Sequence, residues 1–328
     1  MLRRSFCTLL GTGGALAQVA LKPRTAQPEP DDDVFVERPA AGQPHKGKVL
    51  LAVQAHSDDI PLMAAGTVAK LIEEGYTGYL VRATNDDMGD APGLGMPGTI
   101  GENVLRNEQD NEEIARVLGC KRAFNLNYNN HRMADISLNE LTCRLILIIR
   151  VVKADTVVGW DPWAHDEENP DHYMLARGLE AACWMAGRAH DYAEQFAAGL
   201  EPHAVADKYY FARRPEITRV VDISHQIDKK IDADRANTAK GPAGHLGSRL
   251  RSELAKKGER LPLLGNADDV TADRNYIKEF VLRYNRNLGQ KYGIEYAEAF
   301  HYLPPGSAGA GTDPTVEEYV KQHAVPIR

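Results

Sequence analysis

Short apolar runs alternate with amphipathic segments over the first half of the chain. The first of four strand candidates is a short apolar run without a helical period, as expected of a parallel strand buried on both faces. These strand candidates are residues 48–54, 77–83, 121–126 and 155–159. The segments between them have apolar residues at helical spacing, bounded by capping residues or glycine. These helix candidates are residues 61–74, 102–118 and 141–152.

The order of these elements predicts an α/β fold. Strands that alternate with helices form a mostly parallel central sheet, with right-handed crossovers that place helices on both faces. Ligands of such sheets bind outside the carboxyl ends of the strands. The loops that follow Gln54 and Gly159 are therefore where we expect chemistry.

The second half of the chain is less regular. Its candidates are strands at 208–212 and 219–223, helices at 225–239 and 273–292, and a final segment at 295–301. Residues 241–264 mix glycine with basic side chains, so they could form a rim over the pocket, a contact with a neighbouring subunit, or a solvated surface insertion. No linker divides this half, and we expect one domain over residues 47–328.

The first residues resemble an export signal. Arg3 and Arg4 precede a weakly apolar run at 7–21, and small residues and proline follow. We expect residues 1–30 to be an export signal, and the adjacent arginines resemble those of a twin-arginine signal. Residues 31–46 are expected to be a linker. An amphipathic first helix is the alternative. The mature protein would then be periplasmic or extracellular. No later stretch has 18 uninterrupted apolar residues, so we expect no membrane span in that form.

Composition narrows the function classes. Apolar residues make up 43% of the 328 positions, which suits a globular protein with a sizeable core. The formal charge of −7 offers no field for a polyanion, so nucleic acid is not an expected partner. The 4 cysteines lack both paired spacing and the density of a disulfide framework. We expect neither structural bridges nor a cysteine-built zinc site.

Histidine and aspartate side chains follow two of the predicted strands. His56 and Asp59 lie on one tight turn after the first strand, and His172 follows the strand at 155–159 at the predicted start of a helix. Because both strands end at the same sheet edge, the three side chains can converge on one cation. Three nitrogen and oxygen ligands with an open position are typical of catalytic zinc, although other divalent metals accept this set. The alternative is that Asp58 and Asp59 cap the next helix and His172 is a surface histidine.

Several motifs together resemble the PIG-L/LmbE-like zinc N-deacetylases. The most specific is Ala55 to Asp59; the others are Asn169 to His172, Val221 to Ser224 and Tyr296 to Phe300. The resemblance implies a Rossmann-like three-layer sandwich and hydrolysis of N-acetyl groups from amino sugars and their conjugates. It also implies that His56, Asp59 and His172 bind one Zn2+ per chain, with Asp58 as the general base.

Further site residues follow from the same resemblance and from the local sequence. Asp171 would orient a neighbouring side chain or cap the helix. Asn169 stands where the family commonly has a histidine that assists the oxyanion, so Asp58 or His165 would have to supply the proton. The candidates for substrate binding are Arg106, Asn130, where many relatives have aspartate, and the loop residues Trp163 and His165. Trp160 could also stack on a sugar.

Three functions remain open from the sequence. The first is a zinc-dependent hydrolase that removes acetyl from an N-acetylated sugar or glycoconjugate, a small molecule or an oligosaccharide. The second is a non-catalytic carbohydrate-binding relative, suggested by Asn169 and Asn130. The third is a zinc amidase acting on a non-sugar acylated amine. A homo-oligomer is compatible with each of them.

Overall fold

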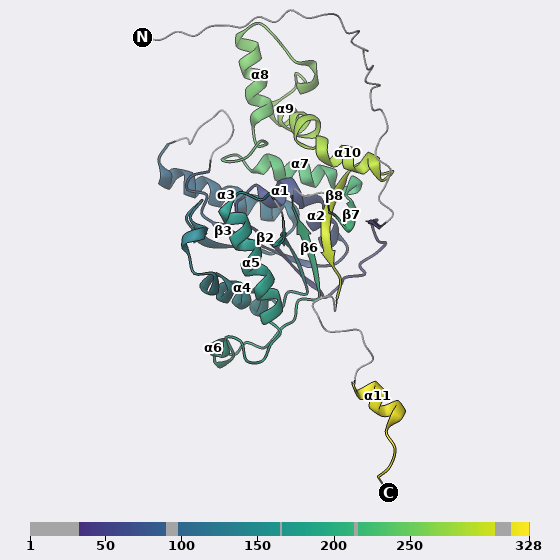
Figure 1. The fold of residues 1–328 in the computed structure, drawn as a ribbon. Helices are drawn as coiled ribbons and strands as arrows, with labels where there is room; N and C mark the ends of the chain where they lie inside the picture. Colours follow the sequence, from purple (N-terminus) through teal and green to yellow (C-terminus); the bar gives the residue numbers. More distant parts are fainter. Residues whose placement is uncertain (1–32, 90–97, 165, 213–215, 306–315, 328) are drawn as a thin grey trace, which may run out of the picture.

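A single eight-stranded sheet forms the centre of the protein (Figure 1). The computed structural model describes residues 33–89, 98–164, 166–212, 216–305 and 316–327. The strand order across the sheet is β1-β7-β8-β6-β5-β2-β3-β4. The strands are β1 (Phe35–Glu37), β2 (Val49–Gln54), β3 (Thr77–Thr84), β4 (Arg122–Tyr128), β5 (Thr156–Trp160), β6 (Asp207–Phe211), β7 (Arg219–Asp222) and β8 (Ala297–Leu303).

Most strands of this sheet run parallel, as the sequence predicted. β2 lies between β3 and β5, and Ala52 of β2 is in register with Leu80 and Val158. β4 extends the sheet beyond β3, and β6 extends it beyond β5, both in parallel. Only β8 is antiparallel to its neighbours, β6 and β7, among the described strands. The carboxyl ends of β2 and β5 therefore meet at one edge.

Helices cover both faces of the sheet, which makes three layers. The helices are α1 (Asp59–Met63), α2 (Ala65–Glu73), α3 (Ile100–Leu118), α4 (Leu138–Val152), α5 (Pro170–Met185), α6 (Ala193–Ala197), α7 (Ile227–Ala236), α8 (Leu246–Lys256), α9 (Asp269–Tyr276), α10 (Arg283–Lys291) and α11 (Val316–His323). Successive residues of β2 point to opposite faces: Leu50 packs with the helices α1, α2, α3 and α7, whereas Leu51 packs with α4 and α5. The predicted α/β sandwich is confirmed.

One predicted helix is broken into two, and the break has a clear cause. The sequence predicted a continuous helix at 61–74, but the chain leaves helical geometry at Ala64, where φ is −146°, and so forms α1 and α2. The ammonium of Lys230 binds the carbonyl oxygens of Pro61 and Leu62, at 2.7 and 2.9 Å. The carboxylate of Glu298 accepts from the amides of Gly66 and Thr67, at 3.0 and 2.7 Å. Distant residues thus satisfy the two helix ends at the break.

Other boundaries differ from the sequence-based expectation. Residues 35–37, inside the expected linker, form β1 and pair with β7. The expected helix at 273–292 is divided by a π-helical turn, Ile277–Val281, into α9 and α10. The expected export signal at 1–30 lies outside the described residues. None of the described helices is long and apolar enough to cross a bilayer. Three of the cysteines, Cys120, Cys143 and Cys183, are free thiols.

Candidate metal centre

The first half of the centre is a tight turn between β2 and α1. The turn begins directly after Gln54, and α1 begins at Asp59. One carboxylate oxygen of Asp59, Oδ2, accepts from the backbone amides of Ala55 at 2.8 Å and His56 at 3.0 Å. The side chain of Asp59 therefore closes the turn that carries it, and this fixes the side chain of Asp59 relative to that of His56.

The second half comes from the start of α5. Asn169 is the N-cap of this helix, Pro170 occupies its first turn, and His172 follows within that turn. Because β2 and β5 end at the same edge, His172 meets the turn after β2, although 116 positions separate it from His56. All three side chains are buried: His56 is 2%, Asp59 5% and His172 6% exposed.

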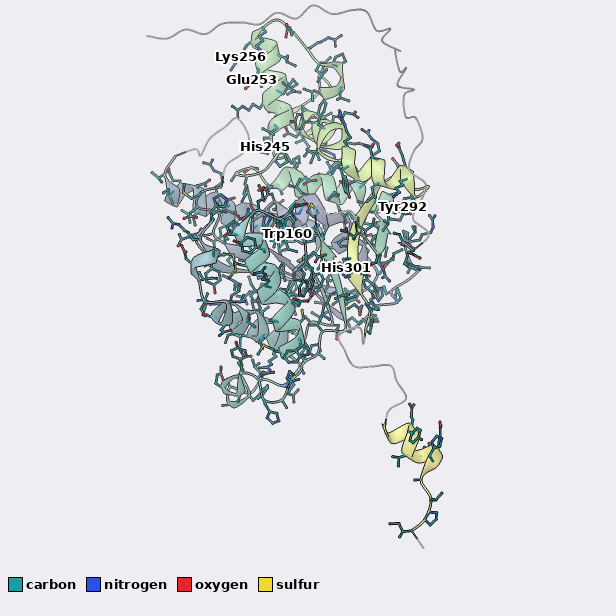
Figure 2. The ribbon with its side chains drawn as sticks, viewed as in Figure 1. Trp160, His245, Glu253, Lys256, Tyr292 and His301 are labelled. Carbon is teal, nitrogen blue, oxygen red and sulfur yellow. The ribbon has the colours of Figure 1, made fainter. Side chains whose placement is uncertain are left out.

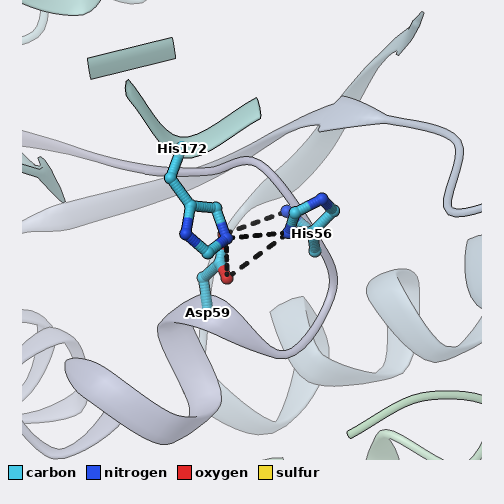
Figure 3. A group of neighbouring side chains, drawn as sticks. All are labelled: His56, Asp59 and His172. Carbon is cyan, nitrogen blue, oxygen red and sulfur yellow. Dashed lines mark hydrogen bonds and ion pairs between the residues drawn. The ribbon is translucent and has the colours of Figure 1, made fainter. Parts of the chain in front are cut away.

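Three atoms of these side chains face one another (Figure 3). His56 Nδ1 lies 3.0 Å from His172 Nε2. Asp59 Oδ1 lies 3.3 Å from His172 Nε2 and 3.7 Å from His56 Nδ1. Ligand atoms bound to a tetrahedral ion at ~2.0–2.1 Å lie roughly 3.3 Å apart. The spacing of this donor set thus fits one divalent metal ion.

The opposite side of each of these groups is already bonded. Asp59 Oδ2 accepts a third hydrogen bond, from Trp160 Nε1 at 2.9 Å, which leaves Oδ1 for a metal. His56 Nε2 contacts Asp171 Oδ2 at 3.0 Å, and His172 Nδ1 contacts Glu167 Oε1 at 2.9 Å. Carboxylates in these positions orient the rings and select the tautomers that present the other nitrogen to a metal.

The charges of the cluster are mutually dependent. Burial lowers the pKa of His56, but the carboxylates of Asp171 and Asp59 outweigh this and raise it to about 9. Burial works against the charged form of Asp59 as well, yet His172 and His56 hold its pKa well below the usual range. Without a metal, protonation of the imidazoles is therefore favoured. The positive imidazolium rings then attract the negative carboxylate of Asp59.

Asp58 lies beside the ligands and is not one of the three converging groups. Its side chain is 16% exposed, and its Oδ1 is 4.0 Å from the ammonium of Lys240. Burial raises its pKa, which Lys240 opposes and the neighbouring carboxylate of Asp59 reinforces. A carboxylate with a raised pKa and partial access to solvent is suited to accept a proton from water.

Two other residues predicted for catalysis have clear structural contacts. Asn169 accepts from the amide of Asp171 at 3.0 Å, so it caps α5. Asp171 is fully buried and, besides His56, accepts from the amides of His131 at 2.6 Å and Met133 at 3.1 Å. The helix-capping role considered for Asp171 is thus taken by Asn169, and Asp171 has the orienting position.

The residues predicted to bind substrate lie in different environments. Asn130 is 2% exposed, and neither atom of its side-chain amide has a hydrogen-bond partner among the described residues. Arg106 is half-buried and lines a cavity of about 410 Å³ with Gly241 and His245. Trp163 is 66% exposed, and its Nε1 donates to Glu180 Oε1 at 2.9 Å. His165 lies outside the described residues.

For some residues around the candidate metal centre, the sequence suggested a different role or no role at all. The sequence suggested that Trp160 could stack on a sugar, but this residue, labelled in Figure 2, is 2% exposed, and its ring stacks on that of His172 with 3.9 Å between the centroids. The assignment to sugar stacking is therefore wrong. Glu167 was missed, although an acidic residue shortly before a predicted histidine ligand is a recognisable signal. Lys240 was also missed, and nothing local indicates its role.

Comparison with known proteins relates part of the chain to one family. Residues 51–183 match the PIG-L family, described as GlcNAc-PI de-N-acetylase, and this segment includes all three candidate ligands. Diacetylchitobiose deacetylase of Thermococcus kodakarensis is 28% identical over 197 residues, which cover 60% of this chain and 71% of that protein.

Solved structures show the same fold. N,N'-diacetylchitobiose deacetylase of Pyrococcus horikoshii superposes with a TM-score of 0.62 at 21% identity, covering 82% of this chain and 88% of that one. The 4-carboxy-2-hydroxymuconate hydratase GalB of Pseudomonas putida superposes with a TM-score of 0.55 at 17% identity, covering 79% and 97%. Since one of these proteins is named as a deacetylase and the other as a hydratase, the fold alone does not fix the reaction.

Proposed function

Because residues 51–183 match the PIG-L family, we propose that this chain is a PIG-L/LmbE-like N-deacetylase, a metal-dependent hydrolase that releases acetate from an N-acetylated sugar or glycoconjugate. The observation that carries this proposal is that three buried side chains, those of His56, Asp59 and His172, converge on one possible position for a metal ion. Asp58 lies next to this group. Amide hydrolysis requires an activated water, a stabilised oxyanion and a proton for the amine, and this arrangement offers a group for each of the three.

The metal we propose is a single zinc ion held by His56 Nδ1, Asp59 Oδ1 and His172 Nε2. Two imidazoles and one carboxylate are a common ligand set of catalytic zinc, although the same set accepts other divalent metals. When bound, such an ion lowers the pKa of a coordinated water toward ~7 and polarises an acyl oxygen. The carboxylates of Asp171 and Glu167, which accept from His56 Nε2 and His172 Nδ1, would hold the two rings in the orientation this requires.

We assign the proton transfers to the carboxylate of Asp58. Its raised pKa makes it a better base near neutrality than an exposed aspartate, for which the pKa is about 3.9. After it accepts the proton of the attacking water, the same carboxyl group can return it to the departing amine nitrogen. Asn169 is engaged in capping α5 and, as an amide, cannot supply a proton, so a separate acid from that position is not part of this proposal.

The substrate class follows from the named relatives. Two of them are diacetylchitobiose deacetylases, and we therefore propose a small N-acetylated saccharide, or a conjugate that carries one. A non-catalytic carbohydrate-binding protein would not require the complete set of three ligands and the base. An amidase for non-sugar amines uses the same centre, and only the substrate panel separates it from the sugar deacetylase.

The test combines metal analysis with an acetate assay. Purified protein is expected to contain one zinc ion per chain and to release acetate from N-acetylglucosamine, diacetylchitobiose or a glycoconjugate. Asp58→Asn should abolish turnover and leave the metal in place, whereas His56→Ala should lose both. Normal turnover by Asp58→Asn would contradict the assignment of the base. A protein that binds saccharides but releases no acetate from any of them would contradict the hydrolase.

We also propose that the protein is exported, on the basis of the sequence at its beginning. Arg3 and Arg4 ahead of a weakly apolar run support a twin-arginine signal, a route used by proteins that fold before transport. Replacing both arginines by lysine should retain the protein inside the cell, where fractionation and immunoblotting would detect it. Unchanged export of this variant would contradict the twin-arginine route.

A further inference from the structure

The loop between α7 and α8 reaches the metal centre. Asp110 of α3 fixes the start of this loop, because its carboxylate accepts from the amides of Thr238 at 2.6 Å and Ala239 at 2.7 Å. The next residue, Lys240, has a side chain that is only 13% exposed. The sequence left open whether residues 241–264 form a rim over the pocket, a contact with a neighbouring subunit or a solvated insertion. The residues just before this segment are anchored and largely buried.

The ammonium of Lys240 lies between two carboxylates. It contacts Asp86 Oδ1 at 2.8 Å and lies 4.0 Å from Asp58 Oδ1. Asp86 is completely buried, and its other oxygen, Oδ2, accepts from the amide of Ser57 at 2.9 Å. Asp86 therefore links Lys240 to the same turn that carries Asp58, and the position of the ammonium is fixed relative to that turn.

The following residue, Gly241, lies so close to Asp58 that little space is left for a side chain. A β-carbon at Gly241 would lie 2.9 Å from Asp58 Oδ2, closer than real β-carbons approach, and 3.0 Å from Asp58 Cβ, tighter than most real contacts. The φ angle of Gly241 is +79°, a conformation that favours glycine. Any side chain at this position would thus have to displace the carboxylate of Asp58 or the loop itself.

We propose that Lys240 and Gly241 form a clamp that positions the carboxylate of Asp58. The ammonium attracts Oδ1 from one side, and the main chain of Gly241 limits the space beside Oδ2. Lys240 is thus a positioning residue, which acts through Asp58. The inference rests on the proposed function only in that Asp58 is the base. Three acidic side chains, of residues 58, 59 and 86, lie close together here, so a fixed cation between two of them also reduces their repulsion.

The first test needs no enzymatic activity. A double-mutant cycle with Lys240→Met and Asp58→Asn in metal-free protein measures the coupling between the two side chains, because the contact of Lys240 with Asp86 is lost equally in both backgrounds. Lys240→Met should lower the melting temperature in both backgrounds. We expect the decrease in the Asp58→Asn background to be smaller than that in wild type by at least about 2 °C. Equal losses in the two backgrounds would overturn the clamp, whether or not the protein is a deacetylase.

The second test separates positioning from a structural role. Lys240→Met should reduce kcat roughly tenfold or more, with KM within about twofold and the metal content unchanged, because a misplaced base affects the chemical step. Alkylating Lys240→Cys with 2-bromoethylamine, in which the thiolate displaces bromide, restores an ammonium at nearly the original position and should recover kcat. Wild-type protein treated in the same way controls for the other cysteines.

A matched control is available at Lys70. Its side chain is 2% exposed and paired with Glu37 and Glu74, at 2.8 and 3.0 Å, and it takes no part in the centre described above. Lys70→Met should therefore destabilise the protein without changing kcat. Wild-type kcat in Lys240→Met, or a loss of kcat that aminoethylation does not restore, would overturn the proposal. If wild-type protein releases no acetate from any substrate, the proposed function fails, and the cycle still decides the clamp.

Discussion

Trp160 donates a hydrogen bond to the carboxylate of Asp59, at 2.9 Å, from the end of the strand beside the turn that carries His56 and Asp59. The same indole ring is nearly parallel to the ring of His172, with 3.9 Å between the centroids and an interplanar angle of 16°. One buried side chain thus restrains two of the three candidate ligands, and it does so from the last residue of β5.

Trp160→Phe should weaken metal binding. Phenylalanine retains an aromatic ring near His172 but cannot donate to Asp59 Oδ2, and loss of such a contact typically costs 10- to 100-fold in affinity. We expect a reduction of about tenfold in zinc affinity, measured by competition with a chelator. Trp184→Phe is the matched control, because Trp184 is 55% exposed. Equal affinities of wild type and Trp160→Phe would show that the turn alone fixes Asp59.

Asp171→Ala should reduce both stability and metal affinity. It removes the acceptor of His56 and leaves the amide of His131 and the buried amide of Met133 without their partner. An unsatisfied buried donor costs about 1–3 kcal/mol, so we expect a loss of at least about 2 kcal/mol in urea unfolding. Zinc affinity should fall about 10-fold or more. If metal binding is unchanged while stability falls, Asp171 supports the backbone and not the orientation of His56.

Asn169 should prove to be a cap. Asn169→Ala removes the acceptor for the amide of Asp171 and should cost about 1 kcal/mol of stability, whereas Asn169→Asp should retain it. Urea unfolding of the two variants measures the difference. Because capping needs only the side-chain oxygen, kcat of Asn169→Asp should stay close to that of wild type. A large loss of kcat in this stable variant would instead assign the amide a role in catalysis.

Asp234 should make stability depend on pH. Both of its carboxylate oxygens lack hydrogen-bond partners among the described residues, and burial, opposed by Lys230, raises its pKa to about 7. The folded protein therefore keeps this proton between pH ~4 and ~7 while the unfolded chain has lost it. The free energy of unfolding should thus fall as pH rises through this range, by about 1.4 kcal/mol per unit for this group, and level off above pH ~7.

The variant Asp234→Asn isolates this contribution. Since asparagine does not ionise, its stability relative to wild type should be greater at pH 8 than at pH 5, as measured by urea unfolding at both values. Asp228→Asn is the control on the same helix, because the side chain of Asp228 is 80% exposed. The same pH profile for wild type and Asp234→Asn would contradict the raised pKa.

Local sequence patterns were sufficient to predict most of the fold and the three converging side chains of the site. The apolar run at 48–54 is a buried strand because every residue of β2 packs in the sheet, and both faces are covered. The turn with His56 and Asp59 could be placed next to His172 from topology alone, since parallel strands end at one edge. Each half of the candidate metal site is a short local motif that can be recognised in the sequence. The parallel sheet brings the two motifs together.

The features that the sequence did not reveal depend on distant contacts. Nothing near Ala64 indicates a helix break, because Lys230 and Glu298 cause it from 166 or more positions away. The same is true of Lys240, whose role depends on Asp86, 154 positions earlier. Trp160 was considered for stacking on a sugar because it lies near the segment with His172. Only the direction of its side chain, set by its register in β5, shows that it points to Asp59.

The buried pair of Lys230 and Glu298 has a consequence for biosynthesis. Glu298 belongs to β8, which the ribosome makes long after the turn that holds His56 and Asp59. Until β8 emerges, the amides at the start of α2 and the ammonium of Lys230 lack their carboxylate, so the helices behind the turn are incompletely supported. A nascent chain should therefore capture its metal late, after translation has passed residue 298, and a chain truncated before that point should be both unstable and metal-free.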